Sequence, residues 1–181
     1  MLSPERVHLR DLSRWASIGA IALTLAGCFQ PMYADRSITG GSGPNLREAM
    51  RDVEVVAVDG RLGQELRNDI IFELTGGAGN PAGAPYKLNM TVSNTSFNAI
   101  IDATSGLAQT ETVSLDVNYK LKDVANDKVV LSDKAIARVT IDRTAQRYAR
   151  VRAVRDAENK AAKIVAEQMR ARVASFFLIK S

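Results

Sequence analysis

Few side chains of this sequence could carry covalent or metal chemistry. The 181 residues include one cysteine, Cys28, and one histidine, His8, and both lie near the N-terminus. The rest of the chain therefore cannot build a Ser-His-Asp triad, a Cys-His pair or a metal site of histidine or thiolate ligands. We expect no cofactor, no metal centre and no enzymatic activity, and the chemistry left to explain is that of Cys28.

Cys28 directly follows Leu25-Ala26-Gly27, at the end of an apolar run from Ala16 to Leu25. Three arginines precede the run: Arg6, Arg10 and Arg14. A basic head, a short apolar core and small residues at a cleavage point are typical of a secretory signal peptide. A cysteine directly after Leu-Ala-Gly resembles a bacterial lipoprotein signal. The run is too short to span a bilayer of about 30 Å, so it is not expected to be a membrane anchor. From the resemblance to a lipoprotein signal we expect cleavage after residue 27 and lipidation of Cys28.

The chain divides into three parts. Residues 1–27 form the cleaved signal, and residues 28–52 form a lipidated N-terminus and tether, because Gly40-Gly41-Ser42-Gly43-Pro44 interrupts regular structure. Residues 53–181 are expected to form one domain. Once Cys28 is lipidated no thiol remains for a disulfide, so this domain depends on a hydrophobic core, which a chain of this length can bury.

The first elements of the domain are a strand and a helix. Val53 to Asp59 is rich in β-branched residues and predicts a strand. An apolar stripe with a spacing of four residues then predicts an amphipathic helix; its members are Leu62, Leu66, Ile70 and Leu74. Gly76-Gly77 should end this helix, since glycine is common just after a helix C-terminus.

Three strands with alternating apolar residues follow. They begin at Tyr86, with a pattern that extends to Phe97, and continue as Val113–Leu121 and Leu131–Ile141, the last interrupted by Asp133. Asn126-Asp127 is the expected turn between the last two strands. The less regular segment Asn98–Ala108 contains the apolar pair Ile100-Ile101 and is a candidate contact loop.

A long helix is expected from about Thr144 to Phe177, without glycine or proline and rich in alanine. Its apolar residues recur every three or four positions: Val154, Ala157, Ala161, Val165, Met169, Val173 and Phe176. At about 50 Å it matches the length of the longer strands. We predict an α+β fold, a two-layer sandwich of two helices on one face of a four-stranded sheet, in the order β-α-β-β-β-α.

Positive charge is concentrated at the C-terminal end of the chain. Residues 143–181 hold ten basic and three acidic residues, whereas residues 28–142 hold eleven basic and fifteen acidic residues. Such asymmetry indicates an anionic partner. The lipoprotein signal argues against nucleic acid, and leaves lipid phosphates, an anionic glycolipid or an acidic protein surface. An arginine-rich helix face that contacts only solvent is an equal alternative.

Two weak catalytic arrangements remain possible. Asp116 and Asp133 lie in strands and could form a carboxylate pair, as in glycosidases. Ser132 and Lys134 could form a Ser-Lys pair. Solvated strand residues have the same pattern, so we expect these four side chains to be surface groups.

Several segments resemble the LPS-assembly lipoprotein family LptE. Phe29-Gln30-Pro31-Met32-Tyr33 is similar to the residues that follow the family's lipidated cysteine, although this chain lacks the glycine that commonly comes first. Arg61–Asn68 resembles the start of the family's first helix, and Tyr119–Asp123 resembles the strand before its turn. Tyr148-Ala149 and Asp156-Ala157-Glu158 resemble its C-terminal helix.

The resemblance implies a non-enzymatic outer-membrane lipoprotein that plugs the LptD β-barrel, helps it assemble and takes part in inserting lipopolysaccharide into the outer leaflet. It implies a location on the periplasmic side and in the barrel lumen, and Phe29 after the cysteine fits outer-membrane sorting. An auxiliary lipoprotein of another lipid-transport or barrel-assembly system is the alternative. From their charge and position, six residues are candidates for binding lipopolysaccharide: Lys120, Lys122, Lys128, Arg143, Arg147 and Arg150. The alternative is that these side chains contact only solvent.

Overall fold

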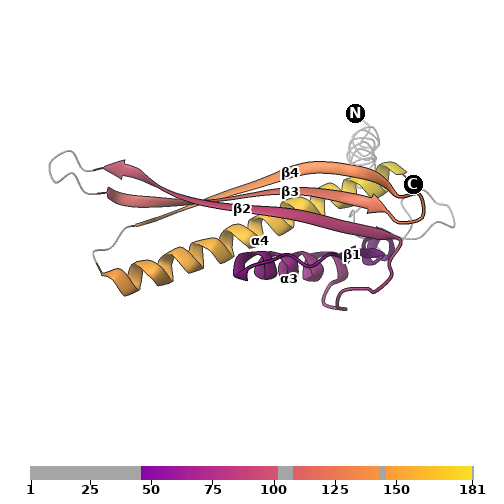
Figure 1. Ribbon diagram of the computed structural model, residues 1–181, viewed down its shortest axis with the longest axis horizontal. Coiled ribbons are helices and arrows are strands. Elements are labelled where there is room, and N and C mark those ends of the chain that lie inside the picture. The colour runs from indigo at the N-terminus through magenta and orange to yellow at the C-terminus, as the bar shows by residue number, and fades with distance from the viewer. Residues whose placement is uncertain (1–45, 102–107, 143–145, 181) are drawn as a thin grey trace, which may run out of the picture.

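The structure, a computed structural model, describes residues 46–101, 108–142 and 146–180. Its elements, in chain order, are α2 (Leu46–Arg51), β1 (Val53–Val55), α3 (Arg61–Thr75), β2 (Tyr86–Ile101), β3 (Ala108–Asp123), β4 (Lys128–Asp142) and α4 (Arg147–Lys180). The sheet has the order β1-β2-β3-β4, in which β1 is parallel to β2 and the other pairs are antiparallel. Figure 1 shows α3 and α4 on one face of this sheet, which confirms the predicted two-layer α+β fold.

The predicted alternation along the strands holds because only one face of the sheet is covered. Every second residue of β3 from Val113 to Leu121 points to the helices and is at most 2% exposed. The cross-strand register brings apolar residues of β2 and β4 beside them, so that Leu88 lies opposite Leu121 and Ala135 lies opposite Val117. The other face of these three strands carries mainly polar side chains, and we call it the outer sheet face.

The helix α3 buries the predicted stripe. Leu66 and Ile70 are fully buried, and Leu74 is nearly so. The helix ends at Gly76, whose left-handed backbone (φ 66°) lets its N–H donate to the carbonyl of Phe72. This is the reason that glycine is favoured at this position.

Gly63 of α3 is buried for a different reason. A Cβ atom at this position would lie 2.6 Å from Cγ1 of Val58 and 3.4 Å from the Val58 carbonyl carbon. The chain that leads from β1 into α3 therefore approaches the helix more closely than a side chain at Gly63 would permit.

Gly63→Ala is expected to destabilise the domain by up to about 2 kcal/mol. Overpacking costs roughly 1–3 kcal/mol, and the better helix propensity of alanine offsets about 1 kcal/mol of it. Urea unfolding would measure the change, with the exposed Gln64→Ala as a control expected within about 0.5 kcal/mol of the native protein. Val58→Ala removes the atom that the new methyl group would meet. If Gly63→Ala destabilises the Val58→Ala variant as much as it destabilises the native protein, the clash explanation is wrong.

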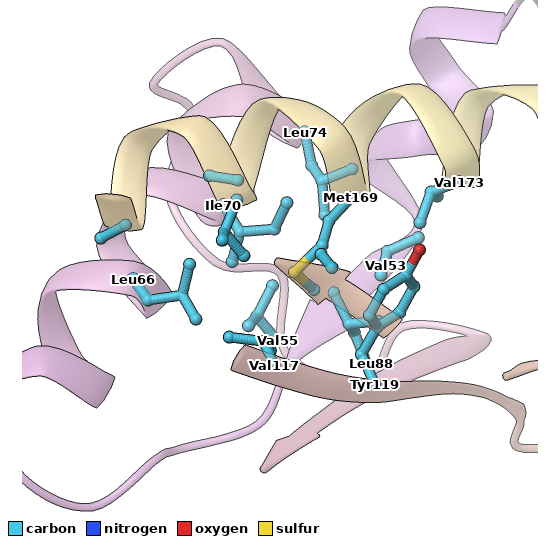
Figure 2. Close-up of a cluster of buried hydrophobic side chains, with 14 of the residues drawn as sticks. Val53, Val55, Leu66, Ile70, Leu74, Leu88, Val117, Tyr119, Met169 and Val173 are labelled. Carbon is cyan, nitrogen blue, oxygen red and sulfur yellow. The ribbon is translucent and has the colours of Figure 1, made fainter. Parts of the chain in front are cut away.

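The helix α4 packs against both α3 and the sheet. Its inward residues are small or apolar and fully buried, among them Ala157, Ala161, Val165, Met169 and Val173. Figure 2 shows Met169 between residues of α3 and residues of the sheet, close to the centre of the core. At the C-terminal end of α4 the rings of Tyr86, Phe176 and Phe177 meet edge to face, with centroids 5.3–6.5 Å apart. Among the described residues, no helix combines the length and the apolar character that crossing a membrane requires.

Three sequence-based boundaries were wrong. Residues 46–51, which we assigned to the tether, form α2, because Met50 is buried against the core. The first strand ends at Val55 rather than Asp59, since β1 pairs with β2 only along Tyr86–Leu88. Asn98–Ile101 continue β2 instead of forming a loop, because they pair with β3 through two register irregularities that break the alternation.

Candidate functional surfaces

Cys28 and Arg143, two of the sites predicted from the sequence, lie outside the described residues. The other five candidates form two groups. Lys120 and Lys122 are on the outer sheet face of β3, and Lys128 begins β4 just after the turn. Lys122 forms an ion pair with Asp127 of that turn, whereas Lys120 and Lys128 are exposed.

The turn that carries these lysines has the predicted form. Asp127 adopts a left-handed conformation with φ 53°. The carboxylate of Asp123 accepts hydrogen bonds from the backbone N–H of Ala125, at 3.0 Å, and from the side-chain amide of Asn126, at 2.9 Å. The turn is thus fixed by local side-chain contacts, and it holds the lysines of β3 and β4 close together.

Arg147 and Arg150 begin α4, and only Arg147 is exposed there. The Arg150 guanidinium donates to Glu111 of β3 at 2.7 Å, and the Glu111 side chain is only 6% exposed. The hydrogen bond to Glu111, followed by its charge, raises the pKa of Arg150. Ser96 of β2 donates to the other oxygen of Glu111. Arg150 therefore has a structural partner that sequence reasoning did not identify.

The two groups do not converge on one site. The β3–β4 turn and the start of α4 lie at opposite ends of the long axis of the molecule, as Figure 1 shows. The β3–β4 turn is instead close to the C-terminal end of α4, because Tyr86, which pairs with Asp123 at the start of the turn, contacts Phe176 and Phe177. A single ligand head group therefore cannot contact both groups at once, and each must be considered separately.

Asp116 and Asp133, which the sequence left open as a possible carboxylate pair, lie on opposite faces of the sheet. Asp116 lies opposite Ile136 on the outer sheet face, whereas Asp133 lies opposite Tyr119 on the face that the helices cover. The side chain of Lys134 is 2.7 Å from Asp116, and Arg172 is 2.8 Å from Asp133. Each carboxylate therefore has its own cation, and the sheet separates the two.

The pKa shifts of these carboxylates follow from their partners. The hydrogen bond from the Lys134 side chain is the main cause that lowers the pKa of Asp116. The backbone N–H of Lys134 is the main cause that lowers the pKa of Asp133, and Arg172 adds to it. Because the ammonium of Lys134 pairs with Asp116, the structure also gives no support to the Ser132–Lys134 pair. The described part of the chain holds no group of acidic, histidine or cysteine residues that could bind a metal.

Asp133→Asn should reduce the loss of stability in acid. A lowered folded-state pKa means that Asp133 stabilises the fold above its unfolded pKa of about 3.9, and that this contribution is lost as the pH falls through the folded-state value. The native protein should therefore lose stability below about pH 4 more steeply than the variant. Urea midpoints measured from pH 7 down to pH 3 would compare the slopes, and equal slopes would contradict the assignment.

The outer sheet face is rich in hydroxyl and amide groups. On β2 it presents Asn89, Thr91, Ser93 and Thr95, which are exposed. On β3, Thr112 and Ser114 are almost buried by their neighbours, and Thr112 shares a hydrogen bond of 2.9 Å with Thr140. Cations accompany these groups at several positions: Lys87, Lys120, Lys122, Lys134 and Arg138. The face is mainly polar and its charges are mainly cationic, with Phe97, Val129 and Ile136 as exposed apolar residues.

Comparisons with known proteins agree with this architecture. The sequence model of the family described as "LptE: Lipopolysaccharide-assembly" matches residues 49–173. No curated protein matches the sequence. A crystal structure described as a lipoprotein from Caulobacter crescentus is 26% identical and has a TM-score of 0.61, covering 75% of this chain and 97% of that chain.

Two further solved structures share the fold at lower identity. The rare lipoprotein B from Shewanella oneidensis is 13% identical, with a TM-score of 0.52, over 70% of this chain and 94% of that chain. A minor lipoprotein from Acinetobacter baumannii is also 13% identical, with a TM-score of 0.51, over 68% of this chain and 88% of that chain. These likenesses extend over nearly the full length of both relatives.

Proposed function

Because the chain belongs to the LptE family of lipopolysaccharide-assembly lipoproteins, we propose that it plugs an LptD-type β-barrel in the outer membrane. In this role it helps the barrel to assemble and takes part in inserting lipopolysaccharide into the outer leaflet, without catalysing a reaction. The observation that carries the proposal is the family match over residues 49–173, which extends from α2 through most of α4.

The shape and surface of the domain support a role as a plug. With 34 residues, α4 is about 50 Å long, and it runs beside strands of 15 or 16 residues. A rigid two-layer body of this length can occupy the lumen of a large barrel, whose interior is polar. The outer sheet face presents hydroxyl, amide and cationic groups, which suit a polar wall better than a lipid environment.

The same face supports a role in contacting lipopolysaccharide. Lys120 and Lys122 lie on it next to Lys87, which is opposite Lys122 in the register of β2 and β3. Phosphates on lipid A and its inner sugars would pair with such cations through charge-assisted hydrogen bonds. Lys128 lies beside them at the start of β4, so we propose the end of the sheet near the β3–β4 turn, rather than Arg150, as the lipopolysaccharide contact.

Charge reversal at Lys120 and Lys128 together should weaken capture of lipopolysaccharide at least about tenfold. One charge-assisted hydrogen bond contributes roughly 1.5–3 kcal/mol, and 1.4 kcal/mol corresponds to a factor of ten. The lipoprotein in detergent would be titrated with labelled lipopolysaccharide. The matched control reverses two exposed lysines of α4, Lys160 and Lys163, and changes the net charge equally. Equal losses in both variants would indicate nonspecific electrostatic attraction and contradict a local site.

Purification of the tagged lipoprotein from gently solubilised outer membranes tests the plug itself. A large β-barrel recovered in equal amount, identified by mass spectrometry, is the expected result. A lipoprotein that elutes without any barrel would contradict the proposal. Recovery with an inner-membrane transporter instead would favour the alternative role, an auxiliary lipoprotein of another lipid-transport system.

A further inference from the structure

One long side of β2 has no neighbouring strand among the described residues. The short strand β1 pairs with β2 only along Tyr86–Leu88, whereas β2 continues to Ile101. The sheet order places β1 and β4 at its two edges, so beyond Leu88 the strand β2 is itself an edge.

The backbone groups on this edge can be assigned from the bonds at its start. The N–H of Tyr86 donates to the carbonyl of Asp52 at 3.2 Å, and the carbonyl of Leu88 accepts from the N–H of Val56 at 3.0 Å. In an antiparallel pair, the backbone N–H and C=O groups of every second residue point to the same side of the strand. The corresponding groups further along β2 therefore point to the open edge; they belong to Met90, Val92, Asn94 and Ser96.

Nothing in the sequence of β2 protects this edge. From Asn89 to Asn98 the strand contains no charged residue and no proline, the usual means of preventing further pairing. The opposite edge differs, because β4 carries Lys134 and Arg138, and the Gln168 side chain donates to the backbone carbonyl of Ile136 at 3.2 Å. Of the two long edges of the sheet, the β2 edge alone lacks such protection. This edge is therefore the one at which a further strand can pair.

The helix layer is incomplete beyond Asn94 of β2. The side-chain amide of Asn94 donates to Glu158 of α4, which also pairs with Arg61 at the start of α3. α3 lies beside α4 from the contacts of Arg61 with Glu158 and Asn159 to the ion pair of Glu73 with Arg170. Figure 1 shows that α3 does not extend along the N-terminal end of α4. Towards that end, α4 has no second helix beside it in the described structure.

The uncovered face of α4 continues the stripe that packs on α3. Counting back from Asn159 in steps of four and three gives Arg155, Arg152 and Tyr148, which lie on one side of the helix. Tyr148 is 73% exposed, and the guanidinium of Arg152 lies 5.9 Å from the centre of its ring. Val151, next to this stripe, is 47% exposed. No carboxylate of the described residues pairs with Arg152 or Arg155.

We propose that an extended segment of a protein partner, with acidic and apolar side chains alternating with polar ones, pairs with the open edge of β2 from Met90 to Ser96. Its acidic and apolar side chains near and beyond Asn94 would point to the face of α4 formed by Tyr148, Val151, Arg152 and Arg155, whereas the residues beside Met90 and Val92 would lie over α3. Backbone hydrogen bonds would supply affinity, and the side chains would supply specificity, as in other cases of strand addition. This inference goes beyond the proposed function and does not depend on the identity of the barrel.

Two other occupants fit the charges less well. A second copy that joined its β2 to this edge would bring no acidic side chain to Arg152 and Arg155, because β2 has no charged residue from Asn89 to Asn98. The tether of the same chain, residues 29–45, contains Asp35 and Arg36 as its only charged residues, so it brings no net negative charge to the arginines.

A designed peptide of about nine residues tests the proposal, since this is a usual strand length. It alternates threonine with glutamate and valine and is added to the isotope-labelled lipoprotein in detergent. Amide hydrogen exchange at Val92, Asn94 and Ser96 should be fast in the free protein and slow by about tenfold or more when the peptide binds. Exchange at Thr91, Ser93 and Thr95, whose amides face β3, should stay slow throughout.

Two controls separate the backbone contribution from the charge contribution. A peptide N-methylated on its pairing amides should not protect the edge. Arg155→Glu should weaken peptide binding about tenfold, whereas Lys163→Glu, an equal charge change elsewhere on α4, should change it less than about twofold.

Several results would overturn the proposal. One is that the edge amides show no protection from exchange at about 1 mM peptide, a concentration that would detect even weak binding. Another is that a peptide with lysine in place of glutamate binds as tightly as the designed peptide. Edge amides that are already slow in a dimer, seen by sedimentation, would assign the edge to a second copy. Edge amides that become fast only when residues 29–45 are deleted would assign it to the tether.

Discussion

Cys28→Ala is expected to weaken retention of the mature protein at the membrane, while some binding to the barrel remains because the plug interface is large. Each buried methylene of an acyl chain contributes about 0.8 kcal/mol, and several chains on one residue make the anchor nearly irreversible. What remains at the membrane should be the fraction held by a protein partner.

The variant needs a modified signal, because we expect residues 1–27 to be a lipoprotein signal whose cleavage requires the cysteine. Residues 1–27 would therefore be exchanged for a secretory signal with an ordinary cleavage site, which leaves no uncleaved apolar segment. Membranes washed with alkaline carbonate would be compared for the variant, the native protein and Gln30→Ala, which keeps the native signal and Cys28. The intact mass of the native protein should show lipidation of Cys28.

Retention of the variant after the carbonate wash, equal to that of the native protein, would contradict lipidation as the anchor. A native protein whose mass lacks acyl groups would contradict it directly. A fraction of the variant that disappears from membranes only when the barrel is depleted would instead measure the partner interaction that we propose.

The elements of the fold were predictable where one face of an element is buried over its whole length. β3 alternates without interruption from Val113 to Leu121, and the stripe from Leu62 to Leu74 has helical spacing. In both, the pattern in the sequence is a direct consequence of burial. The failures lie where tertiary contacts decide. Three residues of β1 form a strand only because β2 accepts them, and α2 is a helix of six residues held by Met50.

One residue of register decides that Asp116 and Asp133 lie on opposite faces of the sheet, a question that the sequence left open. The turn pairs Asp123 with Lys128, but a shift between Leu121 and Lys122 changes the pairing along the rest of the two strands. Without this irregularity Asp133 would lie opposite Asn118, on the same face as Asp116. A shift of one residue moves every side chain of a strand to the other face, and bulges of this kind have no reliable signal in one sequence.

The candidate cations could be identified from the sequence but not placed relative to one another. Their types and exposure follow from composition, since arginine and lysine rarely lie in a core. Their separation depends on the direction of α4, which starts at the end of the sheet that is remote from the β3–β4 turn. The pairing of Arg150 with Glu111 joins residues 39 positions apart, so no local pattern predicts it.

Ala161→Leu is expected to destabilise the domain by about 3 kcal/mol. Ala161 is fully buried in the core that α4 shares with the sheet and α3. Leucine at this position would have to displace either the helix or its neighbours, and overpacking of a dense core costs roughly 1–3 kcal/mol, occasionally more. For a domain of this size the thermal midpoint should fall by about 6–12 °C, which circular dichroism of the lipoprotein in detergent would measure.

Ala171→Leu is the matched control, because it makes the same change on the exposed side of the same helix. It should alter stability by less than about 0.5 kcal/mol, since surface substitutions rarely have larger effects. Equal losses at the two positions would mean that leucine itself disturbs α4, rather than its packing. If Ala161→Leu causes no loss of stability, α4 can move away from the sheet. Close approach of the two layers would then not explain the small residues along the buried face of α4.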